Sequence, residues 1–145
     1  MYTIDRDTII TPQIAMRFAK RHQKEAIRRY DMLDDYYRGR HDILQRSKEG
    51  DLANNRLVCN HAKYISDMSI GYLIGTPVKY NSDEDITQIL DWLQKADAST
   101  QDADLAKDAS VFGTAFELVY LSGDKRPYPK LAVIDPRNAF VVYDD

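Results

Sequence analysis

Residues 106–120 read AKDASVFGTAFELVY, and the spacing of the apolar residues changes inside this stretch. Before Gly113 they recur every three or four residues, as on one face of a helix. After it Phe116, Leu118 and Tyr120 alternate with side chains that point the other way, as in a strand. Glycine is common just past the end of a helix, so Gly113 marks the boundary. The expected fold class is α+β, with helices first and strands after.

The segment after Gly113 predicts a small antiparallel β-meander. The strand around Phe116–Tyr120 is followed by Ser122-Gly123-Asp124, a hairpin signal, and by a returning strand at Leu131–Ile134. A turn at 135–138 leads to a third strand, Ala139–Tyr143. We expect the chain to stop inside this sheet, at Val141–Asp145, so that the meander is incomplete at the C-terminus.

Four helices are expected before Gly113. Their signals are capping side chains, proline in a first turn, carboxylates at a helix start and glycine at a helix end. The first helix is expected to begin at Thr11-Pro12 and end near Gly39, and the second to begin at Asn54-Asn55 and end near Gly71–Gly75. The third is expected to begin at Ser82–Asp85, and the last to span Gln101–Phe112. Pro77 prevents the second helix from continuing. Along the first helix, apolar residues from Ile14 and Phe18 to Tyr37 form a stripe that we expect to be buried.

Composition excludes several classes of protein. The chain has 145 residues, 43% of them hydrophobic and 30% charged, which fits one globular domain and excludes collagen-like, low-complexity and wholly disordered chains. No apolar run approaches the roughly 20 residues of a membrane span, and the N-terminal MYTIDRDTII lacks the pattern of a signal peptide. The single cysteine, Cys59, cannot form an internal disulfide, which favours a reducing compartment.

The net charge of −3 is unevenly distributed. Residues 1–48 carry a charge of +4 and residues 49–145 a charge of −7. Such a division suggests a polar assembly in which one end faces an acidic partner.

Catalytic and metal-binding patterns are not evident. The sequence has no phosphate-binding loop, dinucleotide fingerprint, zinc-protease motif or nucleophile elbow. The histidines His22, His41 and His61 lack the spacing of metal ligands. We expect His61 and Cys59 to be buried structural residues, and the acidic run at Asp83–Asp85 to cap a helix rather than bind a metal. No catalytic, cofactor-binding or metal-binding residue is assigned, and an enzyme is not expected.

The first helix carries a basic ridge. Its members recur at steps of three and four residues and are Arg17, Lys20, Arg21, Lys24 and Arg28. One interpretation is contact with phosphate or with an acidic neighbouring subunit, and the other is an ordinary solvated helix face. Loss of a salt-dependent affinity for DNA on replacing these side chains would indicate phosphate contact.

Four blocks of sequence carry a resemblance to a known family. They are Leu33–Arg46 (LDDYYRGRHDILQR), Asn54–Tyr80 (NNRLVCNHAKYISDMSIGYLIGTPVKY), Ala106–Tyr120 and Ile134–Asp144 (IDPRNAFVVYD). In order and spacing they resemble the N-terminal region of portal proteins from long-tailed bacteriophages, the family typical of phages of Gram-positive hosts. The fingerprint residues are structural: Asn54, Asn55, Gly71, Tyr72, Gly75, Pro77 and Gly113.

The resemblance implies a structural role. Family portals form a homo-oligomeric ring, usually a dodecamer, at one vertex of the capsid in the virion, and they assemble in the host cytoplasm. The ring nucleates shell assembly with capsid and scaffolding proteins, and it docks the terminase. It passes double-stranded DNA without sequence specificity during packaging and ejection, and binds head-completion and tail proteins. No cofactor and no membrane is implied.

The resemblance also implies how the chain is divided. Residues 1–48 correspond to a basic helical arm, 49–112 to a helical segment of the peripheral wing, and 113–145 to its antiparallel strands. Family portals are several hundred residues long, so we expect the chain to be truncated before the clip, stem and crown. The alternative is a small nucleic-acid-binding adaptor or regulator that uses the basic first helix.

Overall fold

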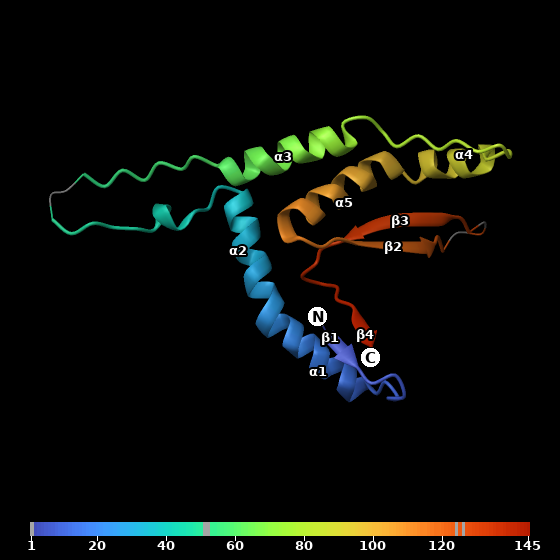
Figure 1. Cartoon of the computed structure of the whole chain (residues 1–145), viewed down its shortest axis with the longest axis horizontal. Coiled ribbons are helices and arrows are strands. Elements are labelled where there is room, and N and C mark those ends of the chain that lie inside the picture. The colour runs from blue at the N-terminus through green and yellow to red at the C-terminus, as the bar shows by residue number, and fades with distance from the viewer. Residues whose placement is uncertain (1, 51–52, 124, 126) are drawn as a thin grey trace.

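The computed structural model describes residues 2–50, 53–123, 125 and 127–145 (Figure 1). Its helices and the hairpin β2–β3 spread outward from the end of α2, and the two termini lie together at the foot of the molecule (Figure 1). The helices, which all precede the hairpin, and the antiparallel pair β2–β3 confirm the α+β class.

The first predicted helix is present as two α-helices joined by a wider turn. α1 spans Pro12–His22, a π-helical turn spans Gln23–Ile27, and α2 spans Arg28–Tyr37. The predicted start is confirmed, because the Ile14 amide donates to Thr11 Oγ1 at 3.4 Å. The predicted end is also confirmed: Gly39 has φ 78°, a left-handed conformation that a side chain disfavours.

A long arm connects α2 to the next helix. Residues 38–50 run out from the body and residues 53–60 return to it, and the regular structure assigned in these two described legs is a short 3₁₀ turn at Asp42–Leu44 (Figure 1). Side chains bridge the two legs: Asn54 Nδ2 donates to the Arg46 carbonyl at 3.2 Å and Arg56 Nη1 to the Leu44 carbonyl at 3.0 Å. Asn54 and Asn55 therefore belong to the arm, and the prediction that they begin a helix was wrong.

Asn60 is the residue that begins α3, which spans His61–Ile74. Its Oδ1 accepts from the Lys63 amide at 3.0 Å, and its Nδ2 donates to the Tyr37 carbonyl at 2.8 Å. One amide side chain thus caps the start of α3 and the end of α2. Only tertiary contact explains this choice, since Asn54, Asn55 and Asn60 have equal intrinsic capping ability.

The remaining helices begin elsewhere than predicted. α4 spans Thr87–Lys95 rather than starting at 82–85, because Asp85 bonds the Thr87 amide and hydroxyl and holds the chain in a turn before the helix. α5 spans Ala98–Phe112, three residues longer at its start than predicted. Asp97, with φ 52°, reverses the chain directly into α5, and burial of Ala98 favours the added turn.

The strands form two separate pairs rather than one meander. β2, Phe116–Leu121, pairs antiparallel with β3, Pro129–Ile134, in the register Phe116↔Ile134. Ser122 continues this pairing with Tyr128, and the predicted turn residue Asp124 lies outside the described residues. The third predicted strand, β4 at Val142–Asp144, does not join the hairpin. It pairs in parallel with β1, Tyr2–Ile4.

The turn after β3 explains this correction. Pro136 is fully buried, and its carbonyl oxygen lies 3.0 Å from Nε2 of the buried His22 on α1. The His22 ring also stacks on Phe140, at 5.1 Å between centroids. These contacts direct the chain away from the hairpin and towards β1, so the antiparallel sheet has two strands.

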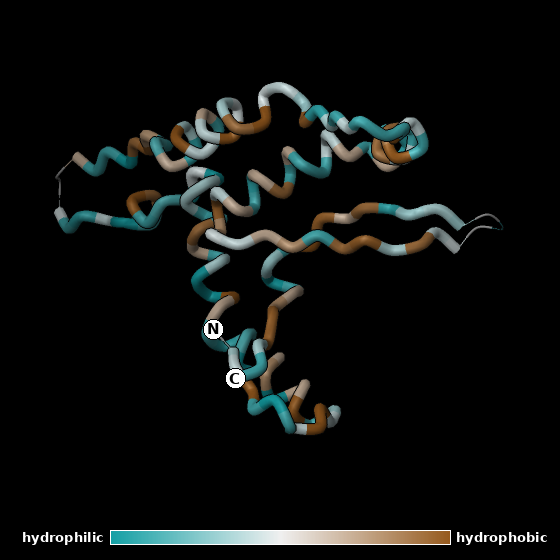
Figure 2. Tube along the Cα trace, turned by 45° about the vertical axis from the view of Figure 1, so that its right-hand side comes forward, coloured by the Kyte–Doolittle hydropathy of each residue, from teal (hydrophilic) through white to brown (hydrophobic). Residues whose placement is uncertain are grey.

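Little of the molecule is core. Phe18 and Ala98 are the buried hydrophobic residues of the described chain, beside the buried polar residues His22, Asp34 and Ser122. The accessible surface is 11641 Å², whereas a compact monomer of 16.7 kDa exposes ~7600 Å². Apolar stretches recur along the hairpin and along α3 (brown in Figure 2). Several of the large hydrophobic side chains in these elements are exposed, among them Tyr72, Leu73, Val119 and Leu121. Surface of this kind is normally covered by other protein.

We predict that Asn60→Ala destabilises the chain by about 1–2 kcal/mol, because it removes caps from two helix ends at once. Asn60→Asp keeps the acceptor for Lys63 and loses the donor to Tyr37, so its loss should be smaller. Urea denaturation followed by circular dichroism measures both. Asn55→Ala is the control, and a loss as large as that of Asn60→Ala would contradict the double cap.

Candidate functional site

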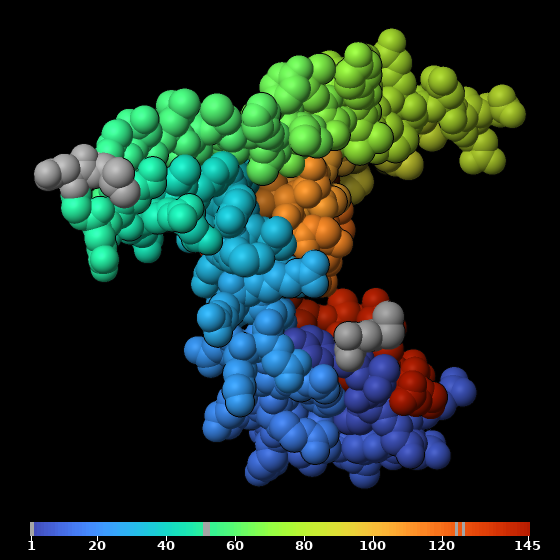
Figure 3. Space-filling model, turned by 60° about the vertical axis from the view of Figure 1, so that its left-hand side comes forward, coloured from blue at the N-terminus to red at the C-terminus, as the bar shows by residue number. Residues whose placement is uncertain are grey.

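The predicted basic ridge is exposed on the foot of the molecule. All five of its side chains lie at the surface of α1, the π-helical turn and the start of α2 (blue in Figure 3). Arg21 is paired with Glu25 at 3.0 Å, and Arg17 lies 5.4 Å from the centre of the Phe18 ring. Among the described residues no carboxylate forms a salt bridge with Lys20, Lys24 or Arg28. The ridge therefore keeps positive charge available for a partner.

The π-helical turn changes the shape of this ridge. One extra residue in a turn rotates all later side chains by about a quarter of a turn around the helix axis. Arg28 lies beyond the turn, so it is rotated away from the line of Arg17, Lys20 and Lys24. The spacing of three and four residues predicts one continuous α-helix, so it does not indicate the π-helical turn. Arg17, Lys20 and Lys24 remain in line, so the basic face is that of α1 extended by Lys24.

The fingerprint residues do not gather into one site. Asn54 and Asn55 lie in the arm, and Gly113 ends α5. The other four lie at or after the end of α3 and are Gly71, Tyr72, Gly75 and Pro77. Gly75 lies where a Cβ atom would collide with the Gly71 carbonyl oxygen. Gly113 has φ 75° and its amide donates to the Ala109 carbonyl. Each of these two glycines meets a backbone requirement.

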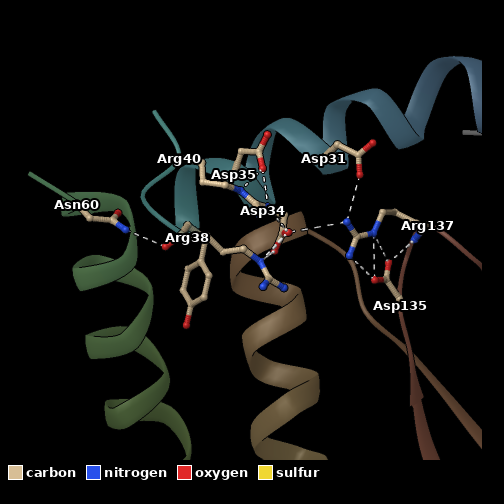
Figure 4. A network of polar contacts seen from close by, with 9 residues as sticks. Asp31, Asp34, Asp35, Arg38, Arg40, Asn60, Asp135 and Arg137 are labelled. Atoms are coloured by element: carbon tan, nitrogen blue, oxygen red, sulfur yellow. Dashed lines mark hydrogen bonds and ion pairs between the residues drawn. The ribbon is translucent and has the colours of Figure 1, made fainter. Parts of the chain in front are cut away.

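An ionic network that the sequence patterns did not reveal joins α2 to the turn after β3 (Figure 4). Asp34, whose side chain is 11% exposed, accepts both bonds from Arg38 Nε, at 2.8 and 2.9 Å. Arg137, 28% exposed, lies 3.1 Å from Asp31 and 3.9 Å from Asp34. It also forms a forked pair with Asp135. The network connects residues more than 100 positions apart in the chain.

The network is electrostatically matched. Hydrogen bonds from Arg137 hold the pKa of Asp135 below its ordinary value, and the bonds to Asp135 raise the pKa of Arg137 in return. The sequence contains one local signal of this network: Asp135 and Arg137 flank Pro136, so their side chains are close enough to pair. Nothing in the sequence indicated that Asp31 and Asp34 would meet them.

A second cluster fixes α3 against the end of α2. Tyr37 donates to Asp67 at 2.7 Å, and Lys63 pairs with Asp67 at 2.8 Å while lying over the Tyr37 ring. Burial, followed by the hydrogen bond to Asp67, raises the pKa of Tyr37. The hydrogen bonds from Lys63 and Tyr37 lower the pKa of Asp67. This cluster orients α3 and presents no free nucleophile.

Two residues considered for chemistry are placed differently from the prediction. Cys59 and His61 are both exposed at the start of α3, so the prediction that they are buried was wrong. α3 begins only at His61, so both residues lie at its exposed start and not on a buried helix face. Within the described part of the chain no three His, Cys, Asp or Glu residues are grouped to hold a metal ion. No helix among those residues is both long and apolar enough to cross a membrane.

These features define a class of protein. The polar networks hold elements in place, while apolar and basic surfaces face outward, as in a subunit that other protein surfaces cover. The family model for phage portal protein, SPP1 Gp6-like, matches residues 17–145. The chain belongs to this family of phage portal proteins, which is structural. No curated protein is significantly similar to it.

We predict that Arg137→Ala destabilises the fold by about 2–3 kcal/mol, because Asp34 and Asp135 keep their charges and lose a shared partner. Arg137→Lys should restore only part of this, since an ammonium group cannot form the fork. Thermal and urea unfolding measure the change. The control is Arg40→Ala, which removes a more exposed arginine from Asp34, and equal losses for both alanine variants would contradict the central role of Arg137.

Asp108, on α5, gives a pH-dependent prediction. Burial, followed by the charge of Asp135, raises its pKa, so the folded state holds this proton more firmly than the unfolded state. Ionised Asp108 therefore costs stability above its folded pKa. Asp108→Asn should be more stable than the parent at pH 7, and the gain should shrink as pH falls through the raised pKa and vanish below the ordinary value, ~3.9.

Urea unfolding from pH 3 to 8 measures this effect. Asp104→Asn, which changes an exposed carboxylate of the same helix, is the control and should alter stability by less than about 0.5 kcal/mol. A gain for Asp108→Asn that is constant over this pH range would contradict the assignment.

Proposed function

We propose that this chain is a wing segment of the portal ring at the capsid vertex, and that the ring is a homo-oligomer, most simply a dodecamer. The observation that carries the proposal is the exposed surface, about half as large again as that of a compact monomer of this mass. The family match supports the portal role. Exposed apolar area on this scale is consistent with coverage by neighbouring protein.

The proposed division of the chain follows the resemblance. Residues 1–48 form the basic arm, 49–112 the helical wing segment and 113–145 the strands, and the clip, stem and crown belong to other parts of a portal. The first and third parts are joined directly by the β1–β4 pair. The wing segment then acts as an outer frame, with the DNA channel formed elsewhere in the ring.

The proposed role of the ring is that of a conduit. It would pass double-stranded DNA during packaging and ejection, dock terminase and head-completion proteins, and contact capsid or scaffolding protein during assembly in the host cytoplasm. No catalytic residue or cofactor is required of this segment. Its acidic balance suits a conduit, because tight binding of DNA would slow translocation.

A second candidate is nucleic-acid binding by the basic face of α1. The specific observation in its favour is that Lys20, Lys24 and Arg28 lack salt-bridge partners among the described residues. Phosphate contact would give affinity for duplex DNA that falls steeply with salt. The acidic remainder of the chain opposes this function.

Electron microscopy and native mass spectrometry of the protein test the portal proposal. We expect ring-shaped oligomers with a central opening and one dominant subunit number. A protein that stays monomeric at high concentration and binds DNA in a salt-dependent manner would instead favour the second candidate.

A further inference from the structure

A mainly apolar hollow that includes two acidic side chains lies at the α4 end of the molecule. It has a volume of about 320 Å³ and is formed by α4, the start of α5 and the segment after α3. Val78, Tyr80 and Leu90 expose apolar surface in it, and Asp97 and Asp102 stand among its lining residues. We refer to this hollow, together with the acidic segment 81–104 that supplies most of its lining, as the acidic hollow.

The acidic hollow has a large unbalanced charge. Residues 81–104 contain seven Asp or Glu residues and one Lys. Asp85 and Asp97 bond to neighbouring threonines, but among the described residues none of the seven carboxylates forms a salt bridge. An apolar surface that includes two carboxylates and is formed largely by an acidic segment favours a partner that combines apolar and basic side chains.

The opposite end of the same molecule has such a surface. Ile9 and Ile10, just before α1, are 83% and 71% exposed, and Met16, within the helix, is 59% exposed. Lys20 lies one helical turn beyond Met16, and Lys24 one turn beyond Lys20. We refer to these five residues as the basic knob. Its charge remains free for an intermolecular contact.

The two surfaces cannot meet within one copy, because α1 lies at the foot of the molecule and α4 at the far upper end (Figures 1 and 3). We propose that the basic knob of one copy docks into the acidic hollow of a second copy. Such a contact joins two different surfaces, so it repeats head to tail and closes into a ring when the rotation permits. This inference rests on the proposed ring and specifies its subunit contact.

Charge and apolar character together favour a second copy over DNA as the occupant. DNA would match Lys20 and Lys24 but would leave Ile9, Ile10 and Met16 facing phosphate and water. It would also leave the acidic hollow without a partner. A second copy satisfies both surfaces at once.

Paired charge reversals test the contact. Lys20→Glu/Lys24→Glu reverses the charge of the knob. Asp91→Lys/Asp102→Lys reverses two charges of the acidic segment, of which Asp102 lines the hollow. These four side chains form no salt bridge within the described chain. Each reversed protein alone should lose assembly, with the association midpoint raised on the order of a hundredfold. An equimolar mixture should assemble again, because knob and hollow charges are then complementary in an alternating ring. The chain with all four changes should assemble too.

Native mass spectrometry and sedimentation at 50–500 mM salt measure assembly, and circular dichroism verifies folding. Lys48→Glu/Lys125→Glu, the same change in charge at two exposed positions outside both surfaces, should assemble as the parent does. Assembly of each reversed protein at the parent's midpoint, or no rescue in the mixture, overturns the contact while the ring stands.

A parent protein that forms no ring under any of these conditions overturns the proposed function itself and the contact with it. Fluorescence anisotropy with a 30-base-pair duplex is measured in parallel. If Lys20→Glu/Lys24→Glu assembles normally and only loses affinity for the duplex, the knob is a DNA-binding surface and the inference is wrong.

Discussion

The pairing of Arg137 with carboxylates from two distant segments is the constraint on which the rest of the structure depends. Asp31 and Asp34 lie on α2, and Asp135 lies in the turn after the hairpin, so one guanidinium fixes where the strands stand relative to the long helix. Asp34 is the most enclosed member of this network, and loss of its partners would leave its charge partly desolvated and unpaired. The network therefore specifies one arrangement of α2 and the turn after β3 in a molecule that has little buried apolar core.

The rest of the framework follows from similar single contacts. His22 on α1 contacts the Pro136 carbonyl in the turn after β3, and Asn60 connects the end of α2 to the start of α3. Trp92 of α4 donates to the Pro129 carbonyl at 2.5 Å. Hydrogen bonds of this kind fix the distance and orientation between two elements at single points, without an extended apolar interface between them. The result is a branched frame with apolar surface on its outside. That shape suits a subunit whose remaining stability comes from assembly.

The candidate surfaces were only partly accessible to prediction. A three-and-four-residue step identified the basic ridge, and all five of its members are exposed, but the π-helical turn that displaces Arg28 has no period of its own. The acidic run near α4 predicts helix capping, and Asp85 does bond the first residue of that helix. The apolar hollow among them depends on Val78, Leu90 and Asp102 meeting from three segments. No local sequence pattern predicts contact between residues of three separate segments.

The sequence by itself determined the local elements: the helix start at Thr11, the stops at Gly39 and Gly113, the hairpin and the α+β class, because each depends on neighbouring backbone and side-chain chemistry. It also determined the family, through blocks spread along the chain. Tertiary structure alone decided which asparagine caps α3, and that the last strand pairs in parallel with β1 instead of extending the hairpin. Those outcomes depend on contacts between residues far apart in the chain. Competing local signals of equal strength can be resolved only by such contacts.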